Sequence, residues 1–545
     1  MKHVALPAMA SLALAIACVS STAKVAVTQA PELAWLADAQ ACAALTSFKL
    51  EQGQVTAAAF VASASAADFR AVPANFSTPF CRVRLTTTPA LGASINHEVW
   101  LPVGHAWNGR FLGTGNGGFA GRIVYSALAN GLSRGYAVAN TDVGTHADTG
   151  FIQMAGDPQR VENYHQRAIH QMTVLGKAVT AEFYQRAPRY ALFAGCSSGG
   201  FEAMTEALNY PTDYNGIVAG APGIDFAGAG LFQGFSYAQT HVSAAAAIGA
   251  NKLPAIEAAV LKQCDARDGL ADGQIDDPAR CSVNLEPLLC QGSETDQCLT
   301  RPQLDALAAL RNGPVNPRSG QRYYPVFPAG AENAGGARAR IAHLSTGTSI
   351  VDASPGPLTL VLGPGWRAER WSSFNFDTDA QAALAAYAPL APSRPDLGPF
   401  MRAGGKLILF HGLRDANIFA QSSVDYYRKL HTTMGSANTE AFSRLYLVPG
   451  MDHCAGGTGP DEFGQVDWKA PAEGAPESDV IGSLDSWVSA GQAPATLVAA
   501  AYEGERLTRT RPLCPWPQVA KYQGGDIDHA DSFICQAAPL EAAGL

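Results

Sequence analysis

A serine stands between two glycines directly after a short apolar run. Residues 195–199 read Gly195-Cys196-Ser197-Ser198-Gly199 and follow the apolar residues 190–194. A strand that leads into G-x-S-x-G and then into a helix is typical of the strained nucleophile turn of serine hydrolases. Such a turn would lift the Ser197 hydroxyl above the edge of a sheet and point a helix N-terminus at developing negative charge. We therefore predict that Ser197 is a nucleophile, although a glycine-rich chain also produces this pattern by chance.

A base and an acid that could activate this serine follow later in the chain. A serine hydroxyl is a poor nucleophile at neutral pH and needs a positioned base, which in turn needs an acid to orient it. In hydrolases with this turn the acid and then the base come after the serine. Asp415 lies just after the apolar run 406–410, and His453 lies just after the run 444–448. We predict a catalytic triad of Ser197, His453 and Asp415.

Two neighbouring residues are alternatives to these assignments. His411 is a rival base, but it lies earlier in its loop than the position expected for a base. Asp452 is a rival acid, but it directly precedes His453, and adjacent residues point their side chains apart. Asp415 can also be read as an ordinary turn or helix-cap residue.

The backbone groups that would stabilise an oxyanion can also be predicted. The amide of Ser198, the residue after the nucleophile, is expected to be one donor. The second is expected from the glycine-rich stretch 112–119, through the amide of Gly117 or Gly118, because glycine lets the backbone approach a substrate closely. This stretch lacks the helix and the acidic residue of a dinucleotide-binding loop.

The elements that must position these residues form an alternating pattern. Apolar runs predict strands, and the stretch 161–186 has apolar residues at helical spacing. Strands that alternate with helices imply a mostly parallel α/β sheet, and together with the serine turn they predict an α/β-hydrolase fold. A helix that covers the sheet is expected over 479–489. The predicted strands are 97–103, 110–113, 135–140, 189–194, 216–220, 406–410 and 444–448.

The length of 545 residues predicts more than one compact core or a large insertion. The gap between the strands at 216–220 and 406–410 is much longer than a crossover needs, so we expect a lid domain there, over the carboxyl ends of the strands. The expected organisation is a catalytic domain of 24–221 and 405–545 with a lid domain of 222–404. A net charge of −9 without a basic cluster argues against nucleic acid as a partner.

The N-terminus has the pattern of a secretory signal. Lys2 and His3 precede an apolar stretch of 4–19 and then small residues, so residues 1–23 are the predicted signal peptide, with a buried N-terminal helix as the alternative. The apolar stretch is short for a membrane span, and no other segment is expected to cross a bilayer. The protein is expected to be secreted or periplasmic. Residues 15–18 weakly resemble a lipid-attachment site, which leaves lipidation of Cys18 open.

Ten cysteines remain after Cys18, and an even number in an exported protein indicates disulfides. Sequence alone allows many connectivities. Short spacings and position favour four of the pairs, which leaves Cys196 and Cys454, the neighbours of the nucleophile and the base, for each other; two free buried thiols are the alternative. The expected pairs are Cys42–Cys81, Cys196–Cys454, Cys264–Cys281, Cys290–Cys298 and Cys514–Cys535.

The set Cys196-Ser197, Asp415 and His453-Cys454 resembles the tannase/feruloyl esterase family. The resemblance covers nearly all of the chain after the signal, and it implies an α/β-hydrolase fold with a lid, the five disulfides above and hydrolysis of aromatic carboxylic esters. Feruloyl and other hydroxycinnamoyl esters, galloyl esters and other aromatic esters such as mono(2-hydroxyethyl) terephthalate are the substrates it implies, some of them attached to polysaccharide. A peptidase or acyltransferase, or a calcium-stabilised binding protein without catalysis, is the alternative.

An acidic stretch in the predicted lid, 264–277, has carboxylates at steps of three and four with glycines between them. Such a loop can wrap a hard cation, although it lacks the final glutamate of an EF-hand. The resemblance implies a structural Ca²⁺ here, with Asp276 or Asp277 as a further ligand option and a solvated acidic turn as the alternative. The implied ligands are the carboxylates of Asp265, Asp268 and Asp272 and the carbonyls of Leu270 and Gln274.

The residues that would bind the acyl group are less well defined. An aromatic face and a cation in the lid suit an aromatic acid, and two residues just past Asp415 are placed to line the same pocket. Each of them is more often an ordinary core or surface residue. The predicted substrate-binding residues are Trp366, Arg367, Phe374, Asn417 and Ile418.

Overall fold

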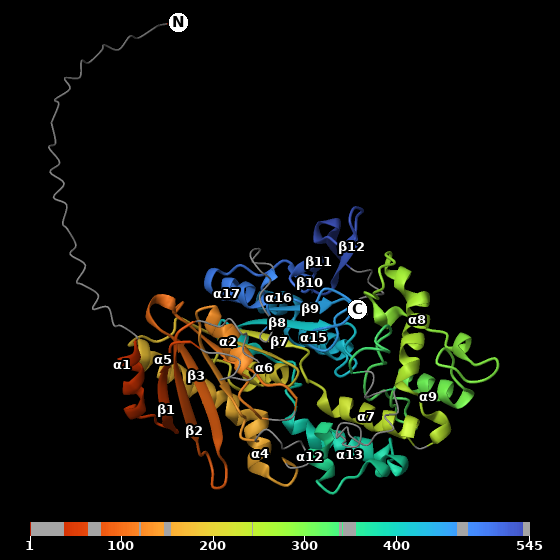
Figure 1. Ribbon diagram of the computed structural model, residues 1–545, viewed down its shortest axis with the longest axis horizontal. Helices are drawn as coiled ribbons and strands as arrows, with labels where there is room; N and C mark the ends of the chain where they lie inside the picture. Colours follow the sequence, from red (N-terminus) through yellow and green to blue (C-terminus); the bar gives the residue numbers. More distant parts are fainter. Residues whose placement is uncertain are drawn as a thin grey trace, which may run out of the picture. The chain divides into compact units, whose positions relative to one another are not determined.

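The computed structural model describes residues 1, 38–63, 78–118, 121–145, 154–241, 243–336, 341, 356–465 and 478–537. The chain divides into two units, Met1–Trp35 and Leu36–Leu545, and the sheet, the helices and the candidate site all belong to the second (Figure 1). The predicted signal peptide and Cys18 lie outside the described residues, apart from Met1.

A nine-stranded sheet with the order β1-β2-β3-β5-β4-β6-β7-β8-β9 forms the centre of this unit. β1, β2, β3 and β5 pair antiparallel, and every pair from β5 to β9 is parallel. This mixed sheet, covered by helices, is an α/β-hydrolase fold, as predicted. The strands are β1 Gln54–Val61, β2 Phe80–Thr87, β3 Ile95–Pro102, β4 Arg110–Thr114, β5 Ala137–Thr141, β6 Tyr190–Cys196, β7 Gly216–Gly220, β8 Lys406–Gly412 and β9 Ser443–Val448.

Both faces of the parallel part of the sheet are buried, because alternate side chains of its strands pack against different helices. Leu407 and Leu409 of β8 belong to the core beneath α5, α6 and α15, whereas Ile408 and Phe410 belong to the core beneath α2 and α17. The continuous apolar runs predicted as strands therefore reflect two-sided burial. The helices are α1 Ala39–Ala44, α2 Tyr125–Ser133, α4 Pro158–Glu162, α5 Ala168–Tyr184, α6 Ser198–Asn209, α15 Ala420–Met434, α16 Ser436–Phe442 and α17 Val480–Ala490.

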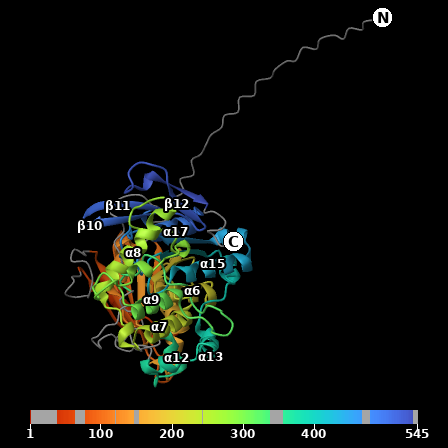
Figure 2. The ribbon, with the colours of Figure 1, turned by 90° about the vertical axis from the view of Figure 1, so that its right-hand side faces the viewer.

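Residues 222–404, here called the insertion segment, connect β7 to β8. The helices of the insertion segment that are labelled in Figures 1 and 2 lie beyond one end of the sheet, whereas Leu397 and Phe400 near its end pack in a core of the sheet itself. One apolar core of the insertion segment joins Phe232, Leu253 and Leu307 to Ala416 and Phe419, which follow β8. The insertion segment thus packs directly on the loop of the predicted catalytic acid; that it forms a separate lid domain stays a prediction. Its helices are α7 Phe226–His241, α8 Leu253–Cys264, α9 Arg301–Asn312, α12 Thr359–Leu362, α13 Thr378–Tyr387 and α14 Gly398–Arg402.

The C-terminal part adds two antiparallel ribbons to the body. β10 Leu497–Glu503 pairs with β11 Arg506–Leu513, and β12 Gln518–Tyr522 pairs with β13 Phe533–Ala537. All five expected disulfides are present, including Cys514–Cys535 between the end of β11 and β13.

One stretch of the described chain, 244–268, has the length and apolar composition of a membrane span. It is a weak candidate, because it consists of two short 3₁₀ turns, the 12-residue helix α8 and a final 3₁₀ turn. A span needs about 20 continuous helical residues.

Candidate active site

Ser197 occupies a sharp turn between β6 and α6. Its backbone has φ 64° and ψ −118°, a conformation that L-residues rarely adopt outside functional sites. A Cβ on Gly195 would lie 2.6 Å from the backbone oxygen of Gly199, and a Cβ on Gly199 would lie 2.8 Å from the oxygen of Asn116. The two glycines of the G-x-S-x-G pattern are therefore required by close backbone approach.

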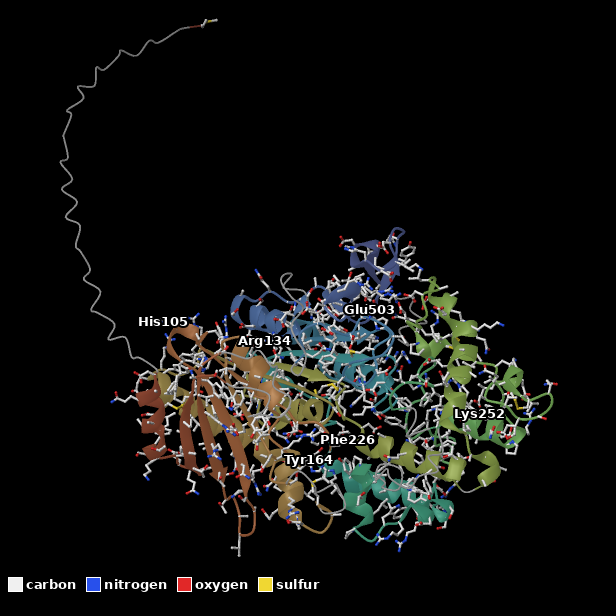
Figure 3. All side chains as sticks on the ribbon, in the orientation of Figure 1. His105, Arg134, Tyr164, Phe226, Lys252 and Glu503 are labelled. Atoms are coloured by element: carbon white, nitrogen blue, oxygen red, sulfur yellow. A yellow bond between two sulfur atoms is a disulfide. The ribbon has the colours of Figure 1, made fainter. Side chains whose placement is uncertain are left out.

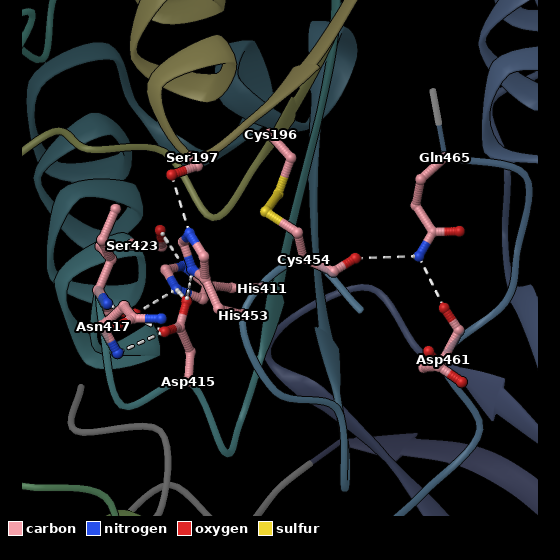
Figure 4. Close-up of a disulfide and its surroundings, with 11 residues drawn as sticks. Cys196, Ser197, His411, Asp415, Asn417, Ser423, His453, Cys454, Asp461 and Gln465 are labelled. Atoms are coloured by element: carbon pink, nitrogen blue, oxygen red, sulfur yellow. Dashed lines mark hydrogen bonds and ion pairs between the residues drawn. A yellow bond between two sulfur atoms is a disulfide. The ribbon is translucent and has the colours of Figure 1, made fainter. Parts of the chain in front are cut away.

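A continuous hydrogen-bond chain joins the three predicted triad residues (Figure 4). His453 Nε2 lies 2.8 Å from Ser197 Oγ, and His453 Nδ1 lies 2.6 Å from Asp415 Oδ2. Because the carboxylate can only accept, Nδ1 carries the proton and Nε2 is the acceptor for the serine hydroxyl. This is the arrangement in which a histidine can remove the serine proton.

The carboxylate of Asp415 is fully buried and surrounded by donors. Its Oδ1 accepts the backbone N–H groups of Asn417 and Ile418, at 2.8 and 2.9 Å. Burial by itself would raise the pKa of Asp415, but the imidazoles of His453 and His411 outweigh it and hold that pKa well below its usual range. Asp415 therefore stays ionised beside the base.

The two alternatives raised by the sequence occupy other places. His411 Nε2 lies 3.1 Å from Asp415 Oδ2 and 2.7 Å from the carbonyl oxygen of Ile418, while its Nδ1 contacts Ser423 Oγ at 2.8 Å. His411 Nε2 faces two acceptors and so donates toward the acid; it is a second imidazole on Asp415, not the partner of Ser197. Asp452 Oδ1 instead lies 3.6 Å from Arg414 Nε, and its Oδ2 accepts from a backbone N–H.

The disulfide Cys196–Cys454 connects the two loops that carry the nucleophile and the base (Figure 4). The Cα atoms of the two cysteines lie 6.0 Å apart, although 258 positions separate them in sequence. Cys454, like Ser197, has a positive φ, of 65°. The bridge therefore fixes the residue before the serine against the residue after the histidine.

The glycine-rich loop after β4 is bound to the nucleophile helix α6 through both backbone groups of Asn116. Asn116 donates its N–H to Glu202 Oε2 at 2.8 Å, and its carbonyl accepts the N–H of Gly199 at 2.8 Å. Burial raises the pKa of Glu202 to about 8, although the Asn116 N–H acts in the opposite direction. Gly117 and Gly118, the next two residues of the loop, line a cavity that also contains Ser197 and His453.

Side chains also hold the predicted oxyanion loop. Ser198 Oγ donates to the carbonyl oxygen of Gly118, and the buried hydroxyl of Tyr164 lies 3.2 Å from the same oxygen and 3.1 Å from Ser198 Oγ. Ser198 therefore contributes a side-chain contact, where the sequence suggests a part for its amide alone. Tyr164, labelled in Figure 3, comes from the π-helical turn Asn163–Arg167, and this turn interrupts the predicted helix 161–186.

A cavity of about 400 Å³ opens above Ser197 and His453. Asn417 and Ile418 line it, as predicted. None of the described residues at its wall is Lys, Arg, Asp or Glu, so the wall is apolar with neutral amides. The other side chains that line it are Asn116, Cys196, Val218, Phe226, Ala229, Gln233, Pro357, Phe410, Cys454 and Gln465.

The structure does not bring Trp366, Arg367 or Phe374 to the wall of this cavity, which corrects their prediction as pocket residues. Trp366 and Phe374 instead stack edge-to-face, with ring centroids 5.9 Å apart, inside an apolar core of the insertion segment. Arg367 is exposed and donates to the carbonyl oxygen of Trp366 at 2.9 Å. Trp366 therefore packs in an apolar core, and Arg367 makes a local hydrogen bond within its loop.

The acidic loop of the insertion segment holds its carboxylates close to one another. Asp265 Oδ1 accepts the N–H of Asp272 at 3.1 Å, and Asp268 Oδ2 accepts the N–H of Asp276 at 3.1 Å. Burial raises the pKa of Asp276 to about 7, and the negative charge of Asp268 adds to this effect. Oxygen donors at this density suit a hard cation such as Ca²⁺.

In the structure, the carboxylates of Asp265 and Asp268 accept hydrogen bonds from backbone N–H groups of the same loop. In the described part of the chain, no three or more His, Cys, Asp or Glu side chains form a cluster that could hold a metal ion. Asp272 pairs with the buried guanidinium of Arg511 on β11. The backbone of Gln274 follows in the same turn, and its side chain is buried. The Ca²⁺ site, with Leu270 and Gln274 as carbonyl ligands, stays a prediction.

Several residues around the site could not be found from the sequence. Glu202 and Tyr164 contact the glycine-rich loop from 86 and 46 positions away in the chain, and Gln465 contacts the carbonyl oxygen of Cys454 from 11 positions away. The one local signal is His411, four residues before Asp415 at the end of the same strand. The loop that follows β8 places Asp415 and the carbonyl of Ile418 around the His411 ring, so His411 contacts the acid and does not act as the base.

Comparison with known proteins gives a consistent result. The family described as "Tannase and feruloyl esterase" matches residues 81–536. An uncharacterized esterase of Xanthomonas campestris is 36% identical, with 92% of each chain covered. A mono(2-hydroxyethyl) terephthalate hydrolase of Piscinibacter sakaiensis is 33% identical, with 79% of this chain and 80% of the relative covered.

Two solved structures have a similar fold over most of the chain. Feruloyl esterase B from Aspergillus oryzae superposes with a TM-score of 0.82 at 27% identity, over 91% of this chain and all (100%) of that one. A tannin acyl hydrolase from Aspergillus niger shares the fold, with a TM-score of 0.75 at 20% identity over 93% and 95% of the two chains. With a match over most of its length and relatives that are esterases, the chain belongs to the tannase and feruloyl esterase family.

Proposed function

We propose that the protein is a secreted serine esterase that hydrolyses aromatic carboxylic esters through an acyl-enzyme on Ser197. The single observation that carries the proposal is the hydrogen-bond chain from Ser197 Oγ through His453 to Asp415, at 2.8 and 2.6 Å, beneath a cavity. A binding protein without catalysis has no need for a nucleophile, a base and an acid in this geometry.

The reaction follows from the positions of these groups. Ser197 Oγ attacks the ester carbonyl carbon while its proton passes to His453 Nε2, and Asp415 stabilises the imidazolium that forms. The carbonyl oxygen becomes an oxyanion, for which the amides of Ser198 and of Gly117 or Gly118 are the proposed donors. The carbon–oxygen bond to the alcohol then breaks, and the alcohol takes the proton from His453. Water repeats the sequence on the acyl-enzyme, so that the acid leaves and Ser197 regains its proton.

The cavity wall supports an aromatic acyl group without a charge of its own. Phe226 and Phe410 supply apolar surface, and Gln233 and Asn417 supply amides that can hydrogen-bond to phenolic hydroxyls. A relative that hydrolyses mono(2-hydroxyethyl) terephthalate keeps that ester as the second substrate to test.

A substrate panel tests the proposal. We expect hydrolysis of methyl ferulate or methyl gallate by the natural chain and none by Ser197→Ala, with mono(2-hydroxyethyl) terephthalate and a peptide as comparison substrates. Turnover of the peptide alone, or esterase activity that survives Ser197→Ala, would overturn it. Feruloylated and galloylated polysaccharide fragments in the same panel would show whether the natural ester is attached to a polymer.

We also propose that Ca²⁺ binds the acidic loop of the insertion segment. The oxygen-only donor set of Asp265, Asp268 and Asp272, with the carbonyls of Leu270 and Gln274, is the kind that Ca²⁺ prefers. When bound, the ion would neutralise crowded carboxylates and stabilise the loop; no step of ester hydrolysis depends on it.

Export is the third part of the proposal. Five disulfides suit an oxidising compartment, and the signal-like residues 1–23 would direct the chain there. Mass spectrometry of the mature N-terminus would distinguish cleavage after Ala23 from lipid attachment at Cys18.

A further inference from the structure

Arg414 directly precedes the predicted catalytic acid, and its side chain points into the insertion segment. The guanidinium is buried, with 7% of the residue exposed. Its Nε donates to the carbonyl oxygen of Gly330 at 2.9 Å, and its Nη2 donates to Glu257 Oε1 on α8 at 2.7 Å. Two donors of one side chain are therefore directed at two parts of the insertion segment.

The same residue also contacts the loop that carries His453. Arg414 Nη1 donates to Thr458 Oγ1 at 2.8 Å, and Asp452 Oδ1, on the residue before His453, lies 3.6 Å from Arg414 Nε. The backbone N–H of Arg414 donates to the carbonyl oxygen of Met451 at 3.0 Å. One residue thus connects the acid loop, the base loop and the insertion segment.

The charges around Arg414 make these contacts interdependent. Burial raises the pKa values of Glu257 and Asp452, and the positive charge of Arg414 lowers both. The two carboxylates also act on each other as like charges. Asp452 Oδ2 in addition accepts the N–H of Gly335 from the insertion segment, at 3.2 Å. Without the guanidinium, two partly buried carboxylates would face each other, and the positive charge that links Asp452 of the base loop to Glu257 of α8 would be lost; the contact with the Gly335 N–H would remain.

We propose that Arg414 is a positioning residue, which uses the insertion segment as a brace to hold the Asp415 and His453 loops in register. The inference rests on the esterase function proposed above. Arg414 does not line the catalytic cavity, so it acts through Asp415 and His453 and not on the substrate. Catalytic groups must hold their geometry within about 0.5 Å, and a displacement of about 1 Å costs about a hundredfold in rate. The insertion segment would then be part of the catalytic scaffold as well as a cover.

The test compares kcat and KM for Arg414→Lys, Arg414→Met and two milder variants, Glu257→Gln and Thr458→Val. We expect kcat to fall about tenfold to a hundredfold in Arg414→Met, with KM within about threefold of the natural value. Lysine keeps the charge but not the fork of donors, so Arg414→Lys should recover only part of the loss. The two milder variants keep Arg414: Glu257→Gln removes the negative charge of one contact but keeps an acceptor oxygen, and Thr458→Val removes one hydrogen bond. Each should lower kcat by a few-fold (~3).

Arg82→Met is the matched control. Arg82 also donates to a buried carboxylate, that of Glu98 (Nη2 to Oε2, 3.0 Å), but on the antiparallel strands β2 and β3, away from the catalytic loops. We expect this variant to lower the melting temperature and leave kcat unchanged.

The outcomes separate the inference from the function on which it rests. Loss of kcat in the folded Arg414, Glu257 and Thr458 variants, at temperatures well below their melting, supports the brace. Unchanged kcat in folded Arg414 variants overturns it; if those variants do not fold, unchanged kcat in both Glu257→Gln and Thr458→Val overturns it. A natural chain without esterase activity would instead refute the proposed function.

Discussion

The Cys196–Cys454 disulfide joins the residue before Ser197 to the residue after His453, with the two Cα atoms 6.0 Å apart. The bridge closes 258 positions of chain and lies beside the 2.8 Å contact between the histidine and the serine. The same covalent bond therefore constrains the unfolded chain and the catalytic geometry of the folded one.

Replacement of both cysteines, Cys196→Ser with Cys454→Ser, should reduce activity at least as much as stability. The chain-entropy model predicts a loss of about 5 kcal/mol in the free energy of unfolding, and the freed loops should lower kcat in the molecules that remain folded. Calorimetry and kcat with methyl ferulate measure the two effects. A folded variant with unaltered kcat would contradict this account.

The pair Cys290–Cys298 supplies the control for that experiment. It closes only 8 positions within the insertion segment, for which the same model gives about 2.5 kcal/mol. Removal of this pair should lower the melting temperature modestly and leave kcat unchanged.

Asp415→Asn should abolish most of the activity while the substrate still binds. The amide would present N–H groups toward His453 Nδ1, which favours the wrong imidazole tautomer, and a loss of about 10⁴-fold in kcat is the magnitude known for this change in a serine protease. KM should change by less than about threefold, since the carboxylate does not touch the substrate. A fall of kcat of less than tenfold would show that another residue orients the base.

The sequence predicts those strands that can be recognised from a continuous run of apolar residues. The stretches 407–410 and 445–448 are apolar or aromatic throughout because both faces of β8 and β9 are covered, and they can be recognised for that reason. β1 and β2 are absent from the predicted strands. They lie at the antiparallel edge, where β1 has no fully buried position and β2 includes partly and fully exposed ones, so the apolar signal is weaker.

The candidate site likewise contains residues that the sequence predicts and residues that it does not. Ser197, Asp415 and His453 follow recognisable strands in a fixed order, so spacing is enough to predict that they meet. Arg414 and Glu202 act through contacts with partners 157 and 86 positions away, respectively, and no local pattern encodes such pairs. Trp366 and Phe374 have the right chemistry for a pocket, but a cluster of aromatic residues is as well suited to a core.

Glu202 should make the protein less stable as the pH rises toward 8. Its pKa is raised to about 8 in the folded protein from 4.5 in the unfolded chain, chiefly by burial. Between these values the folded state retains a proton that the unfolded state has lost, so the free energy of unfolding falls with increasing pH. Glu202→Gln keeps an acceptor for the Asn116 N–H and removes this titration.

Melting temperatures of the natural chain and of Glu202→Gln, measured from pH 5 to 8, test this expectation. The decline with pH should be shallower in the variant, so the difference between the two should change steadily across the range. Parallel curves would show that Glu202 does not retain its proton.

Chelation of Ca²⁺ should lower the melting temperature without abolishing ester hydrolysis. If Ca²⁺ neutralises the carboxylates of the acidic loop, EDTA should reduce the melting temperature, and added Ca²⁺ should restore it. At a temperature at which the chain stays folded, kcat should persist, because the triad does not include the loop. Asp268→Asn should lose the response to EDTA. An unchanged melting temperature on chelation would count against the site.

The most direct measurement of the central claim is reaction with a serine-directed phosphonate, followed by peptide mapping and by assay of methyl ferulate hydrolysis. The account predicts one equivalent of label on the peptide that contains Ser197, complete loss of hydrolysis in proportion to labelling, and neither label nor hydrolysis in Ser197→Ala. Inactivation by label on another residue, or hydrolysis by Ser197→Ala at the rate of the natural chain, would contradict it.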